Sequence, residues 1–285
     1  HGIRDRSPSR GLGDVYKRQT LKSTEAMNKN KKQTVIIEKS DNGVSKIMLN
    51  QPEKHNALSP MMIRELSESF DELKDDPNTK VLIISAKGKS FCAGGDLDWM
   101  KEQIFSDRKT RIEEARKLAD LLYKMYQFPK PLIAKVEGNA FGGGIGIISV
   151  CDVAISIENI KLALTEAKLG LIPATISPYV ISKIGSNNAI DLFTSAFTFS
   201  PPDAKKMGMI KSFCSEENID DIVQKETHSF LVNAPSAVSA SKKLVRNLST
   251  KINEETIQFT VEALADVWEN PEAIEGFNAF FEKRK

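Results

Sequence analysis

The 285-residue sequence has no long hydrophobic run, only three cysteines and three histidines, and little excess charge. Its apolar stretches, such as residues 132–136 and 145–150, fall far short of the roughly 20 residues that span a bilayer, which predicts a soluble chain with no membrane partner. The cysteines lack CxxC spacing and the histidines are scattered. We therefore expect a reducing compartment and no metal site.

The net charge of +2, from 40 basic and 38 acidic residues, gives no global field that would attract nucleic acid. Basic residues gather in the first 32 positions, where apolar periodicity is weak. We predict a disordered leader over residues 1–33 that is non-native before Met27. Acidic residues in the leader argue against a transit peptide, so the cytoplasm is the expected location and the mitochondrial matrix the alternative.

From Thr34 onward, short β-like runs alternate with amphipathic helices, which is typical of an α/β core. Strands are predicted at Val35–Glu38 and Ser45–Leu49, joined by an Asp-Asn-Gly turn. Ser59 and Pro60 have the residue types of a helix N-cap and first turn. The continuous apolar runs Val81–Ile84 and Leu132–Val136 predict strands covered on both faces.

After about residue 215 the strand signals stop. We therefore divide the chain into a core over residues 34–215 and a C-terminal helical region over residues 216–285. Two apolar faces are expected in that region, at Val238, Ser241, Val245 and Leu248 and at Ile257, Val261, Leu264 and Trp268.

Two glycine-containing loops follow the two buried strands, SFCAGGDL at 90–97 and GNAFGGG at 138–144. Glycine lets the main chain approach a ligand closely, and a following helix leaves free N–H groups at the positive end of its dipole. Two such loops can aim two amides at one oxygen, as in an oxyanion hole for a thioester enolate, without a metal or organic cofactor. Taken singly, either loop is better explained as a tight turn. The GxxxxGK[ST] pattern of a phosphate loop is absent.

Four motifs in order resemble the signature of the enoyl-CoA hydratase/isomerase (crotonase) superfamily, from about Val35 to the C-terminus. They are KHNAL at 54–58, FCAGGDL at 91–97, GNAFGGGIG at 138–146 and LTEAKLGLIPA at 164–174. The resemblance implies an α/β fold, a spiral of ββα units, whose C-terminal helices build a homotrimer that usually pairs into a homohexamer. It also implies an acyl-CoA thioester substrate, with CoA as part of the substrate and no separate cofactor.

The resemblance further implies roles for individual residues. Glu166 is the catalytic carboxylate, and the amides of Ala93 and Gly143 form the oxyanion hole. Without the motif, a solvated carboxylate near a helix start would be the preferred explanation of Glu166. The substrate-binding set combines the segment that curls over CoA with the rest of both glycine loops: Lys54, His55, Asn56, Ala57, Leu58, Gly94, Asp96, Leu97, Gly142 and Gly146.

One position departs from the family pattern. Hydratases of the family commonly carry a second glutamate three residues after the middle glycine of the triplet, where this chain has Gly146. Two carboxylates hold the attacking water, whereas one suffices to move a proton between C2 and C4, which favours an isomerase. Against this, GLIPATISPYV at 170–180 resembles the methylglutaconyl-CoA hydratase-like branch, which implies a branched 2-enoyl-CoA and a role in leucine degradation.

The leading hypothesis is an enoyl-CoA hydratase, a lyase of fatty acid metabolism that adds water reversibly to a 2-enoyl-CoA. The nearest alternative is a Δ3,Δ2-enoyl-CoA isomerase that uses a single glutamate. An alternative of another class is a non-catalytic homologue that binds acyl-CoA or RNA. In either enzyme, Trp99, Met100, Ile176 and Tyr179 are expected to shape the acyl pocket.

Overall fold

The computed structural model describes residues 33–249 and 251–284. Residues 34–285 form one compact unit, within which the predicted core and C-terminal region both lie. The predicted leader falls outside the described residues except for Gln33. None of the described helices is long and apolar enough to cross a membrane.

A six-stranded main sheet forms the centre of this unit. It has the strand order β1-β2-β3-β5-β7-β10. β1 and β2 pair in an antiparallel hairpin, and every other neighbouring pair is parallel. The strands are β1 (Val35–Lys39), β2 (Val44–Leu49), β3 (Val81–Ala86), β5 (Leu132–Val136), β7 (Val153–Ile157) and β10 (Ser212–Cys214).

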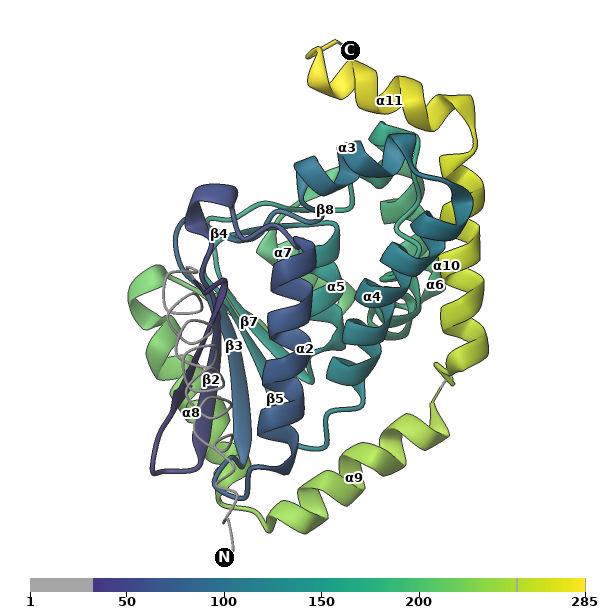
Figure 1. Cartoon of the computed structure of the whole chain (residues 1–285). Helices are drawn as coiled ribbons and strands as arrows, with labels where there is room; N and C mark the ends of the chain where they lie inside the picture. The colour runs from purple at the N-terminus through teal and green to yellow at the C-terminus, as the bar shows by residue number, and fades with distance from the viewer. Residues whose placement is uncertain (1–32, 250, 285) are drawn as a thin grey trace, which may run out of the picture. The chain divides into compact units, whose positions relative to one another are not determined.

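A smaller second sheet has the order β4-β6-β8-β9. Its strands are β4 (Ser90–Cys92), β6 (Asn139–Phe141), β8 (Leu162–Ala163) and β9 (Thr198–Phe199). β4, β6 and β8 each follow a main-sheet strand and precede a helix, so the chain repeats a ββα unit. The predicted crotonase-like fold is therefore confirmed. In Figure 1 the labels β4 and β8 lie above the main sheet.

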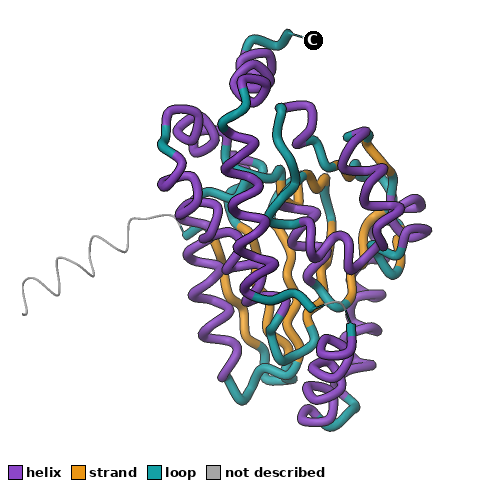
Figure 2. The backbone as a smooth tube through the Cα atoms, turned by 90° about the vertical axis from the view of Figure 1, so that its right-hand side faces the viewer, coloured by secondary structure: helices purple, strands orange, loops and turns teal. Residues whose placement is uncertain are grey.

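The helices cover both faces of the main sheet. Every residue from Val81 to Ser85 of β3 is buried, which requires cover on both sides. α2 lies in front of the sheet and α8 on its other side (Figure 1), and Figure 2 shows strands enclosed between helices. The α-helices of the core are α2 (Pro60–Asp75), α3 (Leu97–Phe105), α4 (Arg108–Tyr126), α5 (Gly143–Val150), α6 (Ser177–Ser195) and α7 (Pro201–Met207). Short 3-10 turns are η1 (Pro52–Lys54), η2 (Glu166–Leu169) and η3 (Glu216–Asn218).

The predicted start of α2 is confirmed. The Ser59 side chain accepts a hydrogen bond from the Met62 amide, and Pro60 occupies the first helical position. Ser59 thus satisfies one of the amides that a helix start leaves without a partner.

Four helices end the chain: α8 (Ile219–Leu231), α9 (Pro235–Leu248), α10 (Glu254–Trp268) and α11 (Pro271–Phe281). α10 packs on α4, and its predicted face is confirmed because Ile257, Val261 and Trp268 are buried. The predicted face of α9 is not buried within the chain, since Val245 is 66% exposed and Leu248 79% exposed.

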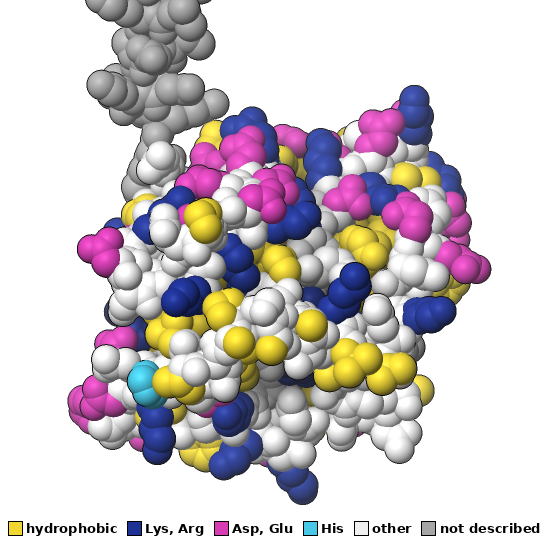
Figure 3. Space-filling model, turned by 90° about the horizontal axis from the view of Figure 1, so that it is seen from below, with side chains coloured by type: hydrophobic (Ala, Val, Ile, Leu, Met, Phe, Trp, Pro, Cys, Tyr) yellow, Lys and Arg dark blue, Asp and Glu magenta, His cyan; other side chains and the backbone are white. Residues whose placement is uncertain are grey.

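Polar contacts attach α9 to the core. Lys242 and Arg246 both bond to the Asp152 carboxylate, and Lys242 also donates to the Lys130 carbonyl. The lower side of the molecule, where α9 lies in Figure 1, carries hydrophobic side chains across its middle when seen from below (Figure 3). The apolar period at Val245 and Leu248 therefore identified a helix but not the surface that it packs on.

Candidate active site

The first glycine loop connects β4 to α3 and is fixed to the segment after η1. Leu58 pairs with Gly95 in a parallel bridge. The Leu58 amide donates to the Gly94 carbonyl at 2.7 Å, and the Asp96 amide donates to the Leu58 carbonyl at 3.3 Å. Gly94 has a φ of +94°, a backbone conformation that favours glycine.

The Ala93 amide is already used inside this loop. It donates a hydrogen bond to the His55 carbonyl at 3.0 Å, so the prediction that it faces an acyl oxygen needs correction. The Gly95 amide, in contrast, has no hydrogen-bond acceptor within residues 33–249 and 251–284. Because Leu58 bonds to the residues on either side of Gly95, the Gly95 N–H points away from Leu58.

The second glycine loop runs into α5 at Gly142, which has a φ of +47° and precedes the first residue of that helix. Gly143 is that first residue, and its amide has no acceptor in the described part of the chain. Helix starts leave such amides free and carry a partial positive charge. The two loops touch, because a Cβ built on Gly94 would lie 3.7 Å from the Gly143 nitrogen.

Glu166 follows β8 and begins η2, and its carboxyl group lies against the second loop. A Cβ built on Gly142 would lie 2.9 Å from Glu166 Oε1 and 3.9 Å from the Gly94 Cα. The residue is partly accessible, but its Oε2 atom is buried and has no hydrogen-bond partner among the described residues. Burial raises the pKa of Glu166 from its ordinary 4.5 to about 7, although a hydrogen bond from its own amide opposes the rise.

Gly146 lies one turn into α5, and apolar side chains fill the space beside it. A Cβ built on Gly146 would lie 2.4 Å from Ile176 Cγ2 and 3.7 Å from Leu122 Cδ2. A glutamate could therefore not be added here without moving Ile176. Ile176 is itself buried, just before α6.

The predicted CoA-binding segment is held mainly by contacts within the chain. Lys54 Nζ lies 3.1 Å from both the Asp96 and Asp98 carboxylates. His55 and Asn56 both have a φ of +53°, and His55 Nδ1 lies 3.1 Å from Ser90 Oγ. These contacts join η1 to the first glycine loop.

Asn56 is fully buried and all three of its side-chain contacts are internal. It accepts from the Gln51 amide and donates to the carbonyls of Lys87 and Ser90, each at 2.8 Å. Its side chain therefore fixes the loop rather than facing a ligand.

The remaining predicted binding residues surround the two loops. Ala57 and Leu58 are buried, and Leu58 Cδ1 would lie 2.7 Å from a Cβ on Gly143. Asp96 caps α3 by accepting from the amides of Asp98 and Trp99. Leu97 is 46% exposed at the start of α3.

The four residues predicted to shape the acyl pocket lie in two places. Met100 Sδ and Trp99 Cζ3 would lie 3.3 and 3.9 Å from a Cβ on Gly95, beside its free amide. Ile176 lies beside Gly146, and the buried Tyr179 has its ring 5.5 Å from that of Tyr126. The Tyr179 hydroxyl has no hydrogen-bond partner among the described residues.

The sequence that forms these loops and includes Glu166 matches a known family. The model of the family described as "Enoyl-CoA hydratase/isomerase" matches residues 39–285. The chain belongs to the enoyl-CoA hydratase/isomerase family. Among the described residues, no cluster of histidine, cysteine, aspartate and glutamate side chains could hold a metal ion.

Similar proteins cover nearly the whole length of this family member. A Thermus thermophilus protein, named provisionally as an enoyl-CoA hydratase, is 30% identical over 85% of this chain and 95% of its own length. The crystal structure of an enoyl-CoA hydratase from Shewanella pealeana has a TM-score of 0.74 at 34% identity, covering 92% of this chain and 97% of that one. One from Mycobacterium avium has a TM-score of 0.78 at 26% identity, covering 89% and 98%.

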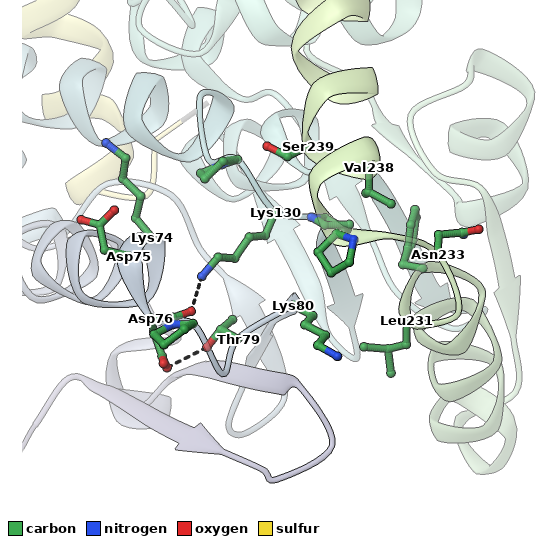
Figure 4. A pocket seen from close by; sticks show the side chains of 15 residues that line it. Lys74, Asp75, Asp76, Thr79, Lys80, Lys130, Leu231, Asn233, Val238 and Ser239 are labelled. Atoms are coloured by element: carbon green, nitrogen blue, oxygen red, sulfur yellow. Dashed lines mark hydrogen bonds between the residues drawn. The ribbon is translucent and has the colours of Figure 1, made fainter.

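A pocket of about 400 Å³ lies away from this site, beside the N-terminal ends of β3 and β5 (Figure 4). Lys130 reaches across it and donates to the carbonyls of Leu73 and Asp76 at 2.7 Å each. Lysine satisfies the last carbonyls of α2 in this way, so Lys130 has a structural role here. It contains none of the predicted site residues, which lie at the opposite, C-terminal ends of the strands.

The motif predicted the amide of Ala93 instead of that of Gly95, which lies two positions further along the same motif. The signal that identifies it is the hydrogen bond that occupies the neighbouring Ala93 amide, which depends on how residues 55–58 fold. Sequence reasoning also missed the contact of Gly170 with α11, where a Cβ built on Gly170 would lie 2.4 Å from the Glu272 carbonyl oxygen. No local sequence signal for this contact exists.

Proposed function

We propose that this chain is an enoyl-CoA hydratase that adds water to a 2-enoyl-CoA. The observation that carries the proposal is the buried Glu166 carboxyl group, which lies against Gly142 where the two glycine loops meet. A carboxyl group with a pKa of about 7 has both protonation states populated near neutral pH, which suits a group that accepts and returns a proton.

In this mechanism the Gly95 and Gly143 amides donate to the thioester oxygen and stabilise the negative charge that develops there. Gly95 replaces Ala93 in this role because the Ala93 amide already donates to His55. Ionised Glu166 takes one proton from a water molecule while the oxygen of that water bonds to C3. The C2–C3 π electrons move onto the thioester, which becomes an enolate. Glu166 then returns that proton to C2, so a single carboxylate completes the addition.

The proposed substrate is a branched 2-enoyl-CoA similar to methylglutaconyl-CoA. The support is the resemblance of residues 170–180 to that branch, together with apolar side chains beside both loops. Met100 lies beside Gly95 and Ile176 beside Gly146, so the space near the reacting carbons has hydrophobic walls. A carbon substituent on C3 is compatible with such walls.

One observation favours a second candidate, a Δ3,Δ2-enoyl-CoA isomerase. Ile176 fills the space next to Gly146, so the chain has no room there for the second carboxylate that hydratases of the family commonly use. Glu166 alone would remove a proton from C2 and return one to C4, with the same two amides holding the enolate.

Product mass and conjugated absorbance together separate the two reactions. Straight and branched 2-enoyl-CoA and 3-enoyl-CoA thioesters would be incubated with the full chain and analysed by mass spectrometry and by the absorbance of the conjugated thioester. A gain of one water on a 2-enoyl-CoA supports hydration, and a larger rate on the branched compounds supports the proposed substrate. A double-bond shift at constant mass without water addition would replace hydration by isomerisation.

The catalytic role of Glu166 is tested by Glu166→Gln, with Glu158→Gln at an exposed position as the matched control. We expect kcat to fall by roughly 10²- to 10⁴-fold for Glu166→Gln, the usual range for loss of a general acid–base, and to stay unchanged for the control. A wild-type rate in Glu166→Gln would show that Glu166 is not the catalytic acid–base, whereas no turnover of any thioester by the wild type would favour a binding protein.

A further inference from the structure

Two glycines far apart in the sequence bring the C-terminal helix into backbone contact with the turn that carries Glu166. Gly276 lies in α11, and a Cβ built on it would be 2.4 Å from the carbonyl carbon of Leu169 and 2.9 Å from the Gly170 nitrogen. A Cβ on Gly170 would be 2.4 Å from the Glu272 carbonyl oxygen. Each glycine thus leaves room for the main chain that faces it.

The contact lies at the end of the turn that Glu166 begins. Gly170 has a φ of +68° and its amide donates to the Ala167 carbonyl, which closes η2. The Leu171 amide donates to the Glu166 carbonyl at 3.0 Å. These bonds make residues 166–171 a compact turn, so a displacement at Leu169 and Gly170 is transmitted to Glu166.

α11 is anchored against this turn by aromatic packing. Trp268 and Phe277 stack with ring centroids 5.0 Å apart, and both are buried in a cluster with Leu171 and Ala273. The atoms that oppose Gly276 belong to the backbone rather than to a flexible side chain. An added methyl group must therefore move either the anchored helix or the turn.

We propose that Gly276 is a positioning residue that holds the Glu166 carboxyl group against the glycine loops and keeps it out of water. The closely packed helix presses the 166–171 turn toward Gly142, and the resulting burial keeps the pKa of Glu166 well above its ordinary value. The expected effect of Gly276 on turnover rests on the proposed function of Glu166. The expected effect of Gly276 on the titration of Glu166 does not.

The test compares Gly276→Ala with Asn278→Ala, an exposed position on the same helix. Alanine is the better helix former, so a helix-propensity effect alone would leave Gly276→Ala as stable as the wild type or more so, with normal kinetics. We expect kcat to fall by about 10²-fold, the effect of misplacing a catalytic group by about 1 Å, while KM changes less than about 3-fold. Asn278→Ala should retain wild-type values.

The pH profile reports on the carboxyl group itself. The inflection that Glu166 contributes, expected near 7 in the wild type, should move toward 4.5 in Gly276→Ala because water reaches the carboxyl group. Phe277→Leu, which loosens the anchor without adding an atom at the turn, should shift both kcat and the inflection in the same direction by less. If Gly276→Ala does not fold, Phe277→Leu tests the proposal alone: a lower kcat and a lower inflection support it, and wild-type values of both contradict it.

A substrate-free measurement separates failure of this inference from failure of the proposed function. The pH dependence of unfolding is compared for the wild type and Glu166→Gln, and again with Gly276→Ala in both chains. The inference predicts that Glu166 contributes less to the pH dependence in the Gly276→Ala background. An equal contribution in both backgrounds, together with wild-type kcat in Gly276→Ala, would overturn it even if Glu166→Gln is inactive. A fully active Glu166→Gln would overturn the proposed function instead.

Discussion

Replacing Glu166 with glutamine should stabilise the folded chain above neutral pH. Burial raises the folded-state pKa of Glu166 from 4.5 to about 7, so the folded chain holds this proton more tightly than the unfolded chain. The contribution of this group to the free energy of unfolding is therefore largest below pH 4.5, decreases between pH 4.5 and 7, and is smallest above pH 7. At about 1.4 kcal/mol per pKa unit, the cost of the ionised carboxylate above pH 7 is at most about 3.5 kcal/mol.

Glutamine has nearly the shape of the protonated acid and cannot ionise, so Glu166→Gln should escape that cost. Urea unfolding of both chains at pH 5, 6, 7 and 8 measures the difference, which should be small at pH 5 and favour glutamine at pH 8. Glu158→Gln, at an exposed position, controls for the change of net charge. Stability curves that stay parallel from pH 5 to 8, or a glutamine variant that is less stable at pH 8, would refute the reasoning.

Three further predictions concern packing and buried polar groups. Asn56→Ala removes three buried hydrogen bonds and should lower the free energy of unfolding by roughly 3 kcal/mol, whereas a loss below 1 kcal/mol in urea unfolding would show that water replaces them. Gly146→Ala should cost about 1–3 kcal/mol by overpacking against Ile176, and a double-mutant cycle with Ile176→Ala should recover part of that cost; strictly additive effects would contradict the contact. Burial lowers the pKa of Lys242 to about 8, so the unfolded chain binds this proton more tightly and stability from this group rises from pH 8 to 10.5. The melting temperature of the wild type should therefore increase between pH 8 and 10.5, and Lys242→Met should remove this increase. If the increase is the same in Lys242→Met, other groups cause it.

The main elements of the fold follow from local sequence patterns. The continuous apolar runs of β3 and β5 predict buried strands, and Ser59 with Pro60 marks the start of α2, because these signals depend on neighbouring residues alone. α9 was predicted from its apolar period, but Val245 and Leu248 are exposed because periodicity does not specify which surface covers a helix.

The site was predicted less completely because its details depend on contacts between distant segments. The free amide is that of Gly95 because His55, near the end of η1, occupies the Ala93 amide. Ile176 fills the space at Gly146 from 30 residues away, and Gly276 meets Gly170 across a still longer separation. No spacing rule within a motif contains this information.

A crystal structure with a non-reacting acyl-CoA bound tests the central claim most directly. We expect the thioester oxygen to lie about 2.7–3.1 Å from the main-chain nitrogens of both Gly95 and Gly143, with the Glu166 carboxyl group facing C2 and C3. A thioester oxygen that contacts neither amide, or a Glu166 side chain turned away from those carbons, would contradict it.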